Sequence, residues 1–477
     1  MRVFVFLCLS FAHNPFARPF EMDTPDETIQ FPGIFFLRWH GRHFFRGHQL
    51  YFRREDYQMG SDQKIGILIT CLEIGGAQKM ALQVFDMLDK MGRPVFLITT
   101  DQTLGMPLHP DKIRAGQLEK KLIQLSRIDI NQPTYHKILA APYQYLKLIA
   151  YIRKNGLDTL LSFEDRANIF NMLSVYTKKR IISIRHPMRS VLVVKDPLKR
   201  ILIRLFFLIF CKRVSKANFN SRESMDEFKT LFSLPDQRLS VIYNFCDHGI
   251  LNSKKDHLPP GKDINDVMNG EFIVACGRFK PVKGFINLVR VFKRVSRKRP
   301  GVKLVLLGDG PLRSSLETMI RHFGLQGSVV LPGFQENTAP WIARAAIFVL
   351  TSQSEGFPNV LLESMALKTA VVSVDCVSGP REILSPGSDY QCKTKTIDFA
   401  ANGVLTPPLK TVDPSLDAPL DFPETCMAEA ILVLLQDPEL RVHYERAGYK
   451  RSLDFSTPGQ QKKWVDLIRP DAEMGGR

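Results

Sequence analysis

The sequence is poor in cysteine and has no long apolar run, and each absence excludes a class of protein. Its eight cysteines are scattered and form no Cys-x-x-Cys pair, so they indicate neither a disulfide framework nor a zinc site. No uninterrupted apolar stretch reaches the roughly 18 residues that a membrane-spanning helix needs. With 44% hydrophobic and 24% charged residues, the composition excludes a disordered or fibrous chain. We expect a soluble or peripheral protein of a reducing compartment, whose 477 residues form two or three domains.

Residues 1–58 lack lysine altogether and differ from the rest of the chain. They hold 11 of the 33 phenylalanines and 4 of the 11 histidines, with neither a helical nor an alternating period. Residues 3–12 resemble a weak signal-peptide core, but no small-residue cleavage site follows them. Met59 opens a polar start that leads into a buried strand. We therefore predict that residues 1–58 are an atypical extension, either dispensable or upstream of the native start.

From residue 64 onward, short apolar runs alternate with amphipathic segments. Runs of strand length occupy 64–71, 94–101, 157–162, 180–184, 272–276, 303–308, 329–333, 346–352 and 370–375. Such alternation predicts parallel sheets covered by helices on both faces. A polar stretch with Pro and Gly at 251–266 interrupts the series and is predicted to be a linker. The fold class is therefore α/β, with two doubly wound Rossmann-like domains facing each other across a cleft that holds the ligand site.

Positive charge is concentrated in one segment. Residues 178–216 hold twelve Lys or Arg and a single acid, Asp196, out of a net charge of +17 for the whole chain. This density predicts an anionic partner, which could be a membrane surface, a polyphosphate or a nucleic acid. A solvated basic face is the alternative explanation.

The segment SQSEGFPNVLLESMA (352–366) carries the clearest chemical pattern. Pro358 suits the first turn of a helix, so the backbone N–H groups of Asn359 and Val360 would lack helical partners and could hold a phosphate. Glu363, farther along the helix, could accept hydrogen bonds from ribose hydroxyls, and Glu355, ahead of it, could reach a sugar ring. Taken alone, the spacing is equally typical of two surface glutamates around a helix start.

This segment resembles the Glu-x7-Glu signature of the retaining family-4 glycosyltransferases, which have the GT-B fold, and the resemblance extends from residue 64 to about 465. It implies a nucleotide-sugar donor. We accordingly assign residues 59–250 to an acceptor-side domain, 267–435 to a nucleotide-sugar-binding domain and 436–477 to a C-terminal helical tail.

Three further motifs follow the family's order in the C-terminal half. In CGRFKPVKGF (276–285), the resemblance implies that Arg278 and Lys283 bind the donor diphosphate and stabilise the leaving group. GDGP (308–311) is similar to a Gly-x-Gly-Pro turn of the family, and LPGF (331–334) resembles the segment that pairs with the nucleobase. GVLTPP (403–408) resembles a later strand, although an insertion at 385–402 precedes it here.

Two motifs of the N-terminal half belong to the same resemblance. LEIGGAQKMA (72–81) resembles a Gly-Gly-Ala-Glu loop over the donor phosphates, but Gln78 stands where Glu is commoner. SIRHP (183–187) ends a strand at the cleft, and the resemblance implies that His186, with Arg185 as second choice, faces the donor sugar. A structural hydrogen bond is the alternative role for this histidine.

The implied catalytic residues are Glu355, Lys283, Arg278 and His186. The implied donor contacts are Gly75, Gly76, Gly308, Gly310, Gly333, Phe334, Gly356, Phe357, Pro358, Asn359, Val360 and Glu363. The chain has no Asp-x-Asp signature of the other major glycosyltransferase fold, so we expect no metal and no cofactor. The family's route implies front-face displacement through an oxocarbenium-like state, in which the leaving phosphate takes the acceptor proton and configuration is retained.

Residues 195–216 form an apolar core with cations around it, predicted to be a helix that lies in an anionic leaflet. The cations placed at the membrane or acceptor side are Arg200, Arg204, Lys212 and Arg213. A buried helix of the N-terminal domain is the alternative. Membrane contact would suit a glycan or polyprenyl-diphosphate-linked acceptor at the cytoplasmic face of the inner membrane.

The predicted function is thus sugar transfer from a UDP- or GDP-sugar to such an acceptor. A GT-B phosphorylase or epimerase is the rival enzyme, although the Glu-x7-Glu segment and the lack of an obvious cofactor-lysine motif speak against it. A nucleic-acid-binding protein is the rival suggested by charge alone. Because no platform of interleaved aromatic and basic residues is visible, we expect no nucleic-acid partner.

Overall fold

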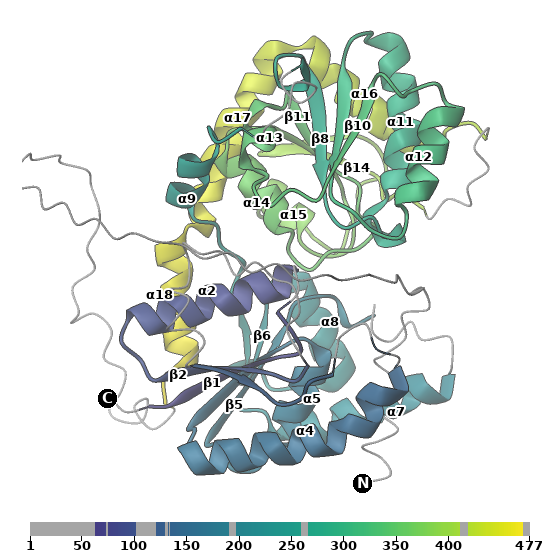
Figure 1. Cartoon of the computed structure of the whole chain (residues 1–477). Coiled ribbons are helices and arrows are strands. Elements are labelled where there is room, and N and C mark those ends of the chain that lie inside the picture. Colours follow the sequence, from purple (N-terminus) through teal and green to yellow (C-terminus); the bar gives the residue numbers. More distant parts are fainter. Residues whose placement is uncertain are drawn as a thin grey trace, which may run out of the picture.

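The computed structural model describes residues 63–72, 75–101, 121–128, 132, 134–189, 197–258, 266–410 and 418–470. The predicted extension at 1–58 lies outside the described residues. The described chain forms two sheets, each flanked by helices, and the two α/β domains are stacked one above the other in Figure 1. The predicted fold class is confirmed.

The N-terminal domain holds a seven-stranded parallel sheet in the order β3-β2-β1-β4-β5-β6-β7. Its strands are β1 (Ile65–Ile69), β2 (Val95–Thr99), β3 (Leu122–Gln124), β4 (Thr159–Phe163), β5 (Lys179–Ile184), β6 (Lys216–Phe219) and β7 (Leu239–Val241). Its helices are α2 (Gly76–Lys90), α4 (Thr134–Asn155), α5 (Asp165–Leu173), α7 (Pro197–Phe210) and α8 (Arg222–Phe232). The next helix, α9 (His248–Lys254), packs against the other domain, as Figure 1 shows. The order reverses between β1 and β4, the kind of position where such sheets bind ligands at the strands' carboxyl ends.

The C-terminal domain repeats this plan with the order β10-β9-β8-β11-β12-β14-β13, in which only β13 runs antiparallel among the described strands. Its strands are β8 (Phe272–Cys276), β9 (Lys303–Leu307), β10 (Val329–Gly333), β11 (Ile347–Leu350), β12 (Ala370–Val374), β13 (Asp398–Ala400) and β14 (Gly403–Thr406). Its helices are α11 (Phe285–Lys298), α12 (Arg313–His322), α13 (Ala339–Arg344), α14 (Asn359–Ala366), α15 (Pro380–Leu384), α16 (Phe422–Gln436) and α17 (Pro438–Ser452). Short 3-10 turns lie at Cys211–Arg213, Asp236–Arg238, Pro281–Lys283 and Leu453–Phe455.

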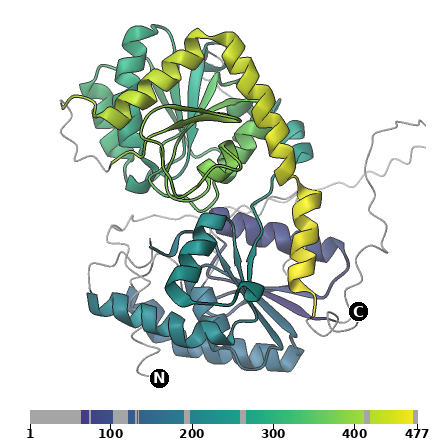
Figure 2. The same cartoon turned by 180° about the vertical axis from the view of Figure 1, so that it is seen from behind.

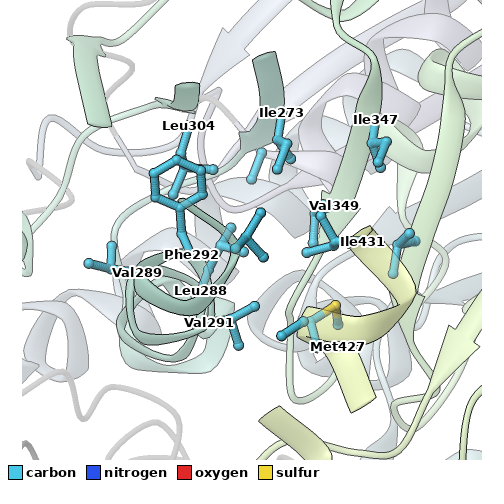
Figure 3. Packing of buried hydrophobic residues seen from close by; sticks show 14 of the residues in the cluster. Ile273, Leu288, Val289, Val291, Phe292, Leu304, Ile347, Val349, Met427 and Ile431 are labelled. Atoms are coloured by element: carbon cyan, nitrogen blue, oxygen red, sulfur yellow. The ribbon is translucent and has the colours of Figure 1, made fainter. Parts of the chain in front are cut away.

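The core of the C-terminal domain shows why these runs become strands and helices. Ile273, Leu304 and Ile347 project from neighbouring strands onto α11 and α16, and all three are fully buried (Figure 3). On α11, apolar residues such as Leu288 and Phe292 recur at helical spacing and cover this face of the sheet. Burying each such side chain stabilises the fold by roughly 1.5–3 kcal/mol.

The C-terminal tail returns to the N-terminal domain. α17 runs along the C-terminal domain, and α18 (Thr457–Ile468) crosses to the side of the other sheet, as both views show (Figures 1 and 2). Trp464 and Ile468 are buried in the same cluster as β1, and the Gln63 amide donates to the Ile468 carbonyl over 3.0 Å. The segment predicted as a helical tail therefore completes the core of the first domain.

The predicted linker at 251–266 is partly helical. α9 extends to Lys254, and the Asp247 carboxylate accepts from the Ile250 N–H at its start (2.9 Å). The polar composition therefore did not indicate that α9 ends inside the first part of this stretch.

Candidate active site

The first turns of α2 and α14 meet across the cleft between the domains. Each helix is preceded by a residue in extended conformation, Gly75 or Pro358, and within the described residues neither start has a side-chain cap. A Cβ added at Gly76 would lie 3.5 Å from the Asn359 amide nitrogen. Two uncapped helix starts that face each other present backbone N–H groups and positive dipole ends, an arrangement suited to a diphosphate.

An ion pair crosses the cleft beside these helix starts. The Lys79 ammonium, on the first turn of α2, contacts the carboxylate of Glu363 on α14. The side chain of Glu363 is 13% exposed, whereas that of Lys79 is 44% exposed. The residue predicted to bind ribose thus faces the cleft with a lysine of the opposite domain as its partner.

Lys283 and Glu355 form a second ion pair at the base of the C-terminal side. Lys283 Nζ lies 2.6 Å from Glu355 Oε1. Burial lowers the pKa of Lys283, but the Glu355 carboxylate outweighs burial and the net pKa is raised. Gly284 fixes this position: its φ is 66°, and a Cβ there would lie 2.2 Å from the Thr351 carbonyl oxygen. Lys283, which is predicted to bind the phosphate, and Glu355, which is predicted to bind the sugar, therefore contact each other directly.

Gly308 and Gly310 allow the GDGP turn to pack closely against the loop at 277–279. A Cβ at Gly308 would lie 2.0 Å from the Gly277 carbonyl oxygen, and one at Gly310 would lie 2.7 Å from that of Phe279. These glycines thus seat the GDGP turn on the loop that carries Arg278, an exposed residue. The structure places both at this packing contact, and their predicted contact with the donor stays a prediction.

Residues 331–334, predicted to pair with the nucleobase, lie beside that turn. The Gly333 carbonyl accepts from the Gly308 N–H over 2.9 Å, and Gly333 has a φ of 80°. Phe334 is 50% exposed, so its ring is accessible for stacking.

Gly356 and Phe357 serve packing between the domains. A Cβ at Gly356 would lie 1.9 Å from the carbonyl oxygen of Arg185, which belongs to the N-terminal domain. The Phe357 ring is buried, with its centroid 4.8 Å from that of Tyr243 and 5.3 Å from that of Phe455. The Phe357 side chain is therefore a core residue, which leaves only its backbone for the donor contact that the sequence predicted.

His186 follows β5 and pairs with a carboxylate. Its Nε2 lies 3.2 Å from Asp165 Oδ2, at the first residue of α5. Burial lowers the pKa of the imidazole, but Asp165 outweighs burial and raises it to about 9. The raised pKa favours the protonated imidazole. Arg185, the second choice, is directed into the core, where its guanidinium donates to Asn218 Oδ1 (2.9 Å) and burial lowers its pKa to about 9.

Sequence reasoning missed Glu164, the residue that follows β4. Its carboxylate accepts from the Thr70 backbone N–H (3.3 Å) and from Gln78 Nε2 (2.6 Å). Burial raises its pKa to about 7. The available signal was an acid at the carboxyl end of a strand next to the reversal of strand order.

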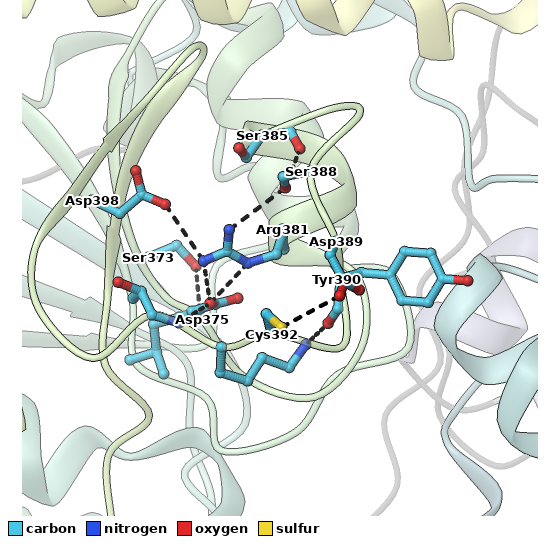
Figure 4. Close-up of polar contacts among 12 residues, drawn as sticks. Ser373, Asp375, Arg381, Ser385, Ser388, Asp389, Tyr390, Cys392 and Asp398 are labelled. Atoms are coloured by element: carbon cyan, nitrogen blue, oxygen red, sulfur yellow. Dashed lines mark hydrogen bonds and ion pairs between the residues drawn. The ribbon is translucent and has the colours of Figure 1, made fainter.

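The insertion at 385–402 reaches the other domain. Arg381 pairs with Asp375 ahead of the insertion and with Asp398 inside it, and it also donates to Ser388 Oγ over 3.5 Å, as Figure 4 shows. From the insertion, Lys393 Nζ contacts the Glu223 carboxylate of α8 over 2.8 Å. Together with Glu382, whose carboxylate accepts from the first two N–H groups of α8 (2.9 and 3.1 Å), these contacts fix one side of the cleft.

The basic helix α7 shows features of both predicted alternatives. One face is buried, with Ile203, Phe206 and Phe207 in the domain core. The other face exposes apolar side chains and two cations: Ile201, Leu205, Leu208, Ile209, Arg200 and Arg204. Lys212 is exposed, whereas Arg213 is partly buried and donates to the Ser174 carbonyl over 3.5 Å. Of the helices that the structure describes, none is both long and apolar enough to cross a membrane.

Comparison with known proteins agrees with this geometry. Residues 262–406 match the family model described as glycosyl transferases group 1. Over 367 residues the chain is 28% identical to the uncharacterized glycosyltransferase MJ1059 of Methanocaldococcus jannaschii, covering 74% of this chain and 89% of that protein.

A second relative comes from Campylobacter jejuni. It is the N-acetylgalactosamine-N,N'-diacetylbacillosaminyl-diphospho-undecaprenol 4-alpha-N-acetylgalactosaminyltransferase, 27% identical over 327 residues, with 67% of this chain and 83% of that protein covered. Among solved structures, Anabaena Alr3699/HepE in complex with UDP has the same fold, with a TM-score of 0.64, 17% identity, and 85% and 99% of the two chains covered.

Two facing Rossmann-like domains, arranged as in the Anabaena structure, define the GT-B fold. Residues 262–406 match the group 1 glycosyltransferases, and the chain is a glycosyltransferase that uses a nucleotide-sugar donor.

Proposed function

We propose that the chain transfers a hexosyl or N-acetylhexosaminyl group from a UDP- or GDP-sugar to a lipid-linked saccharide, with retention of configuration. The observation that carries this proposal is the meeting of two uncapped helix starts, at Gly76 and Asn359, beside the Lys283–Glu355 ion pair. One small region thus offers amides for a diphosphate, a cation for a leaving group and a carboxylate for a sugar.

The donor's parts can be assigned to these groups in order. The diphosphate lies between the starts of α2 and α14, with Lys283 and Arg278 on the C-terminal side. Ribose hydroxyls donate to Glu363, and they replace Lys79 as its partner. The sugar lies toward Glu355 and His186. The raised pKa of His186 favours the imidazolium, in which both ring nitrogens donate, so its proposed role is to donate a hydrogen bond rather than to remove a proton.

The proposed chemistry needs no covalent enzyme intermediate. The bond from the anomeric carbon to the β-phosphate oxygen breaks, and the acceptor oxygen bonds to the same carbon on the same face. The acceptor's proton passes to the departing phosphate. Lys283, Arg278 and the two helix starts stabilise the negative charge that develops on the diphosphate, which is where fixed positive groups lower the barrier most.

The acceptor proposal is supported by the outer surface of the N-terminal domain. α7 exposes apolar side chains with Arg200 and Arg204 among them, a composition suited to an anionic leaflet. α4, at the same lower edge of the molecule in Figure 1, exposes a stripe of Tyr135, Leu139, Tyr143 and Leu146. The Campylobacter relative is named for an acceptor on diphospho-undecaprenol. We therefore propose a peripheral position on the cytoplasmic face of the inner membrane.

A panel of UDP-, GDP- and ADP-sugars tests the donor assignment, with calorimetric binding of each nucleoside diphosphate and donor hydrolysis as readouts. We expect one nucleotide to bind clearly more tightly than the others, and its sugar nucleotide to be hydrolysed slowly without added acceptor. If no nucleoside diphosphate binds, the assignment of the cleft to a donor is wrong. An anomeric proton NMR spectrum of the transfer product tests retention.

A further inference from the structure

Glu164 is a partly buried carboxylate to which the chemistry above gives no role. It stands directly after β4, its φ is 72°, and its two oxygens accept from different parts of the cleft wall. Oε2 accepts from the backbone N–H of Thr70, just after β1, and Oε1 accepts from the side chain of Gln78 on the first turn of α2. A non-glycine residue at positive φ costs conformational energy, which the surroundings must offset.

Gln78 links this carboxylate to the glycine pair. Its side chain is buried, and a Cβ built on Gly75 would lie 2.3 Å from Gln78 Oε1. The amide of Gln78 is therefore packed against Gly75 with one end and bonded to Glu164 with the other. Lys79, the next residue, contacts Glu363 of the opposite domain. The first turn of α2 is thus held from both sides.

We propose that Glu164 is a positioning residue: through Gln78 and the Thr70 amide, it holds Gly75 and Gly76 at the place where the donor diphosphate binds. This inference rests on the proposed function, because it concerns the same donor site. Glu164 acts through Gln78 and does not touch the reacting atoms.

The pair also accounts for the glutamine at position 78, where the family resemblance would have favoured glutamate. A glutamate at 78 would bring a second carboxylate to the oxygen that now accepts at 2.6 Å, and two carboxylates so close cannot both stay ionised. The contact therefore accommodates one carboxylate and one amide, which in this chain are Glu164 and Gln78.

Glu164→Gly is the first test, because glycine accepts a φ of 72° without strain and the substitution removes a partly buried carboxylate. We expect the melting temperature to stay the same or rise, while the Kd of the best nucleoside diphosphate and the donor KM rise about tenfold. The value of kcat should change less, because the diphosphate is held in the ground and transition states alike. A merely structural role would instead lower the melting temperature or the active fraction and leave KM unchanged.

A swap of the two residues is the second test and serves also if Glu164→Gly fails to fold. Gln78→Glu alone should weaken diphosphate binding about tenfold by repulsion. The double variant Gln78→Glu/Glu164→Gln restores one amide and one carboxylate, because the new amide at position 164 can accept from Thr70 and donate to the new carboxylate at position 78. We expect it to recover binding to within about threefold of the wild type.

Glu445→Gln, a partly buried glutamate on α17 of the other domain, is the matched control and should leave both constants unchanged. The inference is overturned if Glu164→Gly binds the diphosphate within twofold of the wild type, or if the double variant binds no better than Gln78→Glu. If the wild type itself binds no nucleoside diphosphate, the proposed donor site fails instead, so the two failures are distinguishable.

Discussion

The two sides of the cleft hold their functional groups by different means. On the C-terminal side, backbone packing dominates: glycines at 284, 308, 310 and 356 each leave a main-chain atom where a Cβ would stand. On the N-terminal side, contacts between side chains dominate, with Glu164 holding Gln78 and Asp165 holding His186. Close backbone packing requires glycine at fixed positions, which can be recognised in the sequence. Contacts between side chains join residues about 20 to 90 positions apart and give no recognisable sequence pattern.

The largest expected effect tests the C-terminal side. Lys283→Ala should lower kcat by about 10²–10³-fold, the range measured when one preorganised group that stabilises developing negative charge is removed. Affinity for the nucleoside diphosphate should fall less, because the charge of Lys283 matters most as the diphosphate leaves. Steady-state kinetics and calorimetry measure the two quantities, and Lys280→Ala in the same loop is the control. An equal loss in kcat and affinity would contradict the assigned role.

The next largest effect distinguishes the roles of Glu363 and Glu355 on the C-terminal side. Glu363→Gln should weaken binding of the bare nucleotide by about one or two decades, since a hydrogen bond to a charged group is worth roughly 1.5–3 kcal/mol. Glu355→Gln should impair transfer and leave nucleotide binding nearly intact, because its assigned partner is the sugar. Lys79→Gln frees Glu363 for ribose and should not weaken binding of the nucleoside alone. Equal weakening of nucleotide binding by both glutamate variants would overturn the assignment.

This difference also explains what the sequence could predict. The strands at 272–276 and 329–333 match the predicted residues, because apolar runs bounded by glycine and proline are local signals. The sequence marks Glu164 only as an acid after a strand, and the contacts that give it a positioning role depend on β4 lying beside β1 and on the entry angle of α2. The return of α18 to the first domain was hidden for the same reason: Trp464 packs on Phe163, whose ring centroid lies 5.8 Å away but which is distant in the sequence. Phe357 lies in a recognisable motif, yet only packing reveals that its ring faces the core.

Gly356→Ala tests whether close backbone packing at a glycine also holds the two domains together. Its Cβ would lie 1.9 Å from the Arg185 carbonyl oxygen, and backbone cannot move aside as a flexible side chain can. We expect a loss of about 1–3 kcal/mol in the free energy of unfolding, as for overpacked cores, measured by urea denaturation. Gly327→Ala, with no atom within 4 Å of the added Cβ, should be nearly neutral. A neutral Gly356→Ala would show that the domains separate readily at this contact.

The outer face of the N-terminal domain gives a smaller effect. Arg200→Gln/Arg204→Gln removes two exposed cations from α7, each worth on the order of 1 kcal/mol at an anionic surface. Sedimentation with anionic liposomes should fall by about one decade, whereas donor hydrolysis should be unchanged. Arg297→Gln/Arg321→Gln removes two exposed cations from the other domain and serves as the control. Liposome binding that is lost equally in both pairs would indicate a general charge effect rather than a docking face.

The smallest expected effect separates two titrating groups of the N-terminal side. The pKa of His186 is raised from 6.5 to about 9, so its contribution to stability is complete below pH 6.5 and is lost as the pH rises through 9. The pKa of Glu164 is raised from 4.5 to about 7, so the fold disfavours its ionised form, and this cost develops between pH 4.5 and 7.

His186→Gln should therefore lower the melting temperature near pH 6 and have little effect near pH 10. Glu164→Gln should change stability in the favourable direction as the pH rises from about 4 to 8, because an uncharged amide avoids the growing cost. Melting curves across this range measure both. If the melting temperature of Glu164→Gln relative to the wild type fell as the pH rose from about 4 to 8, the cost assigned to the buried carboxylate would be wrong.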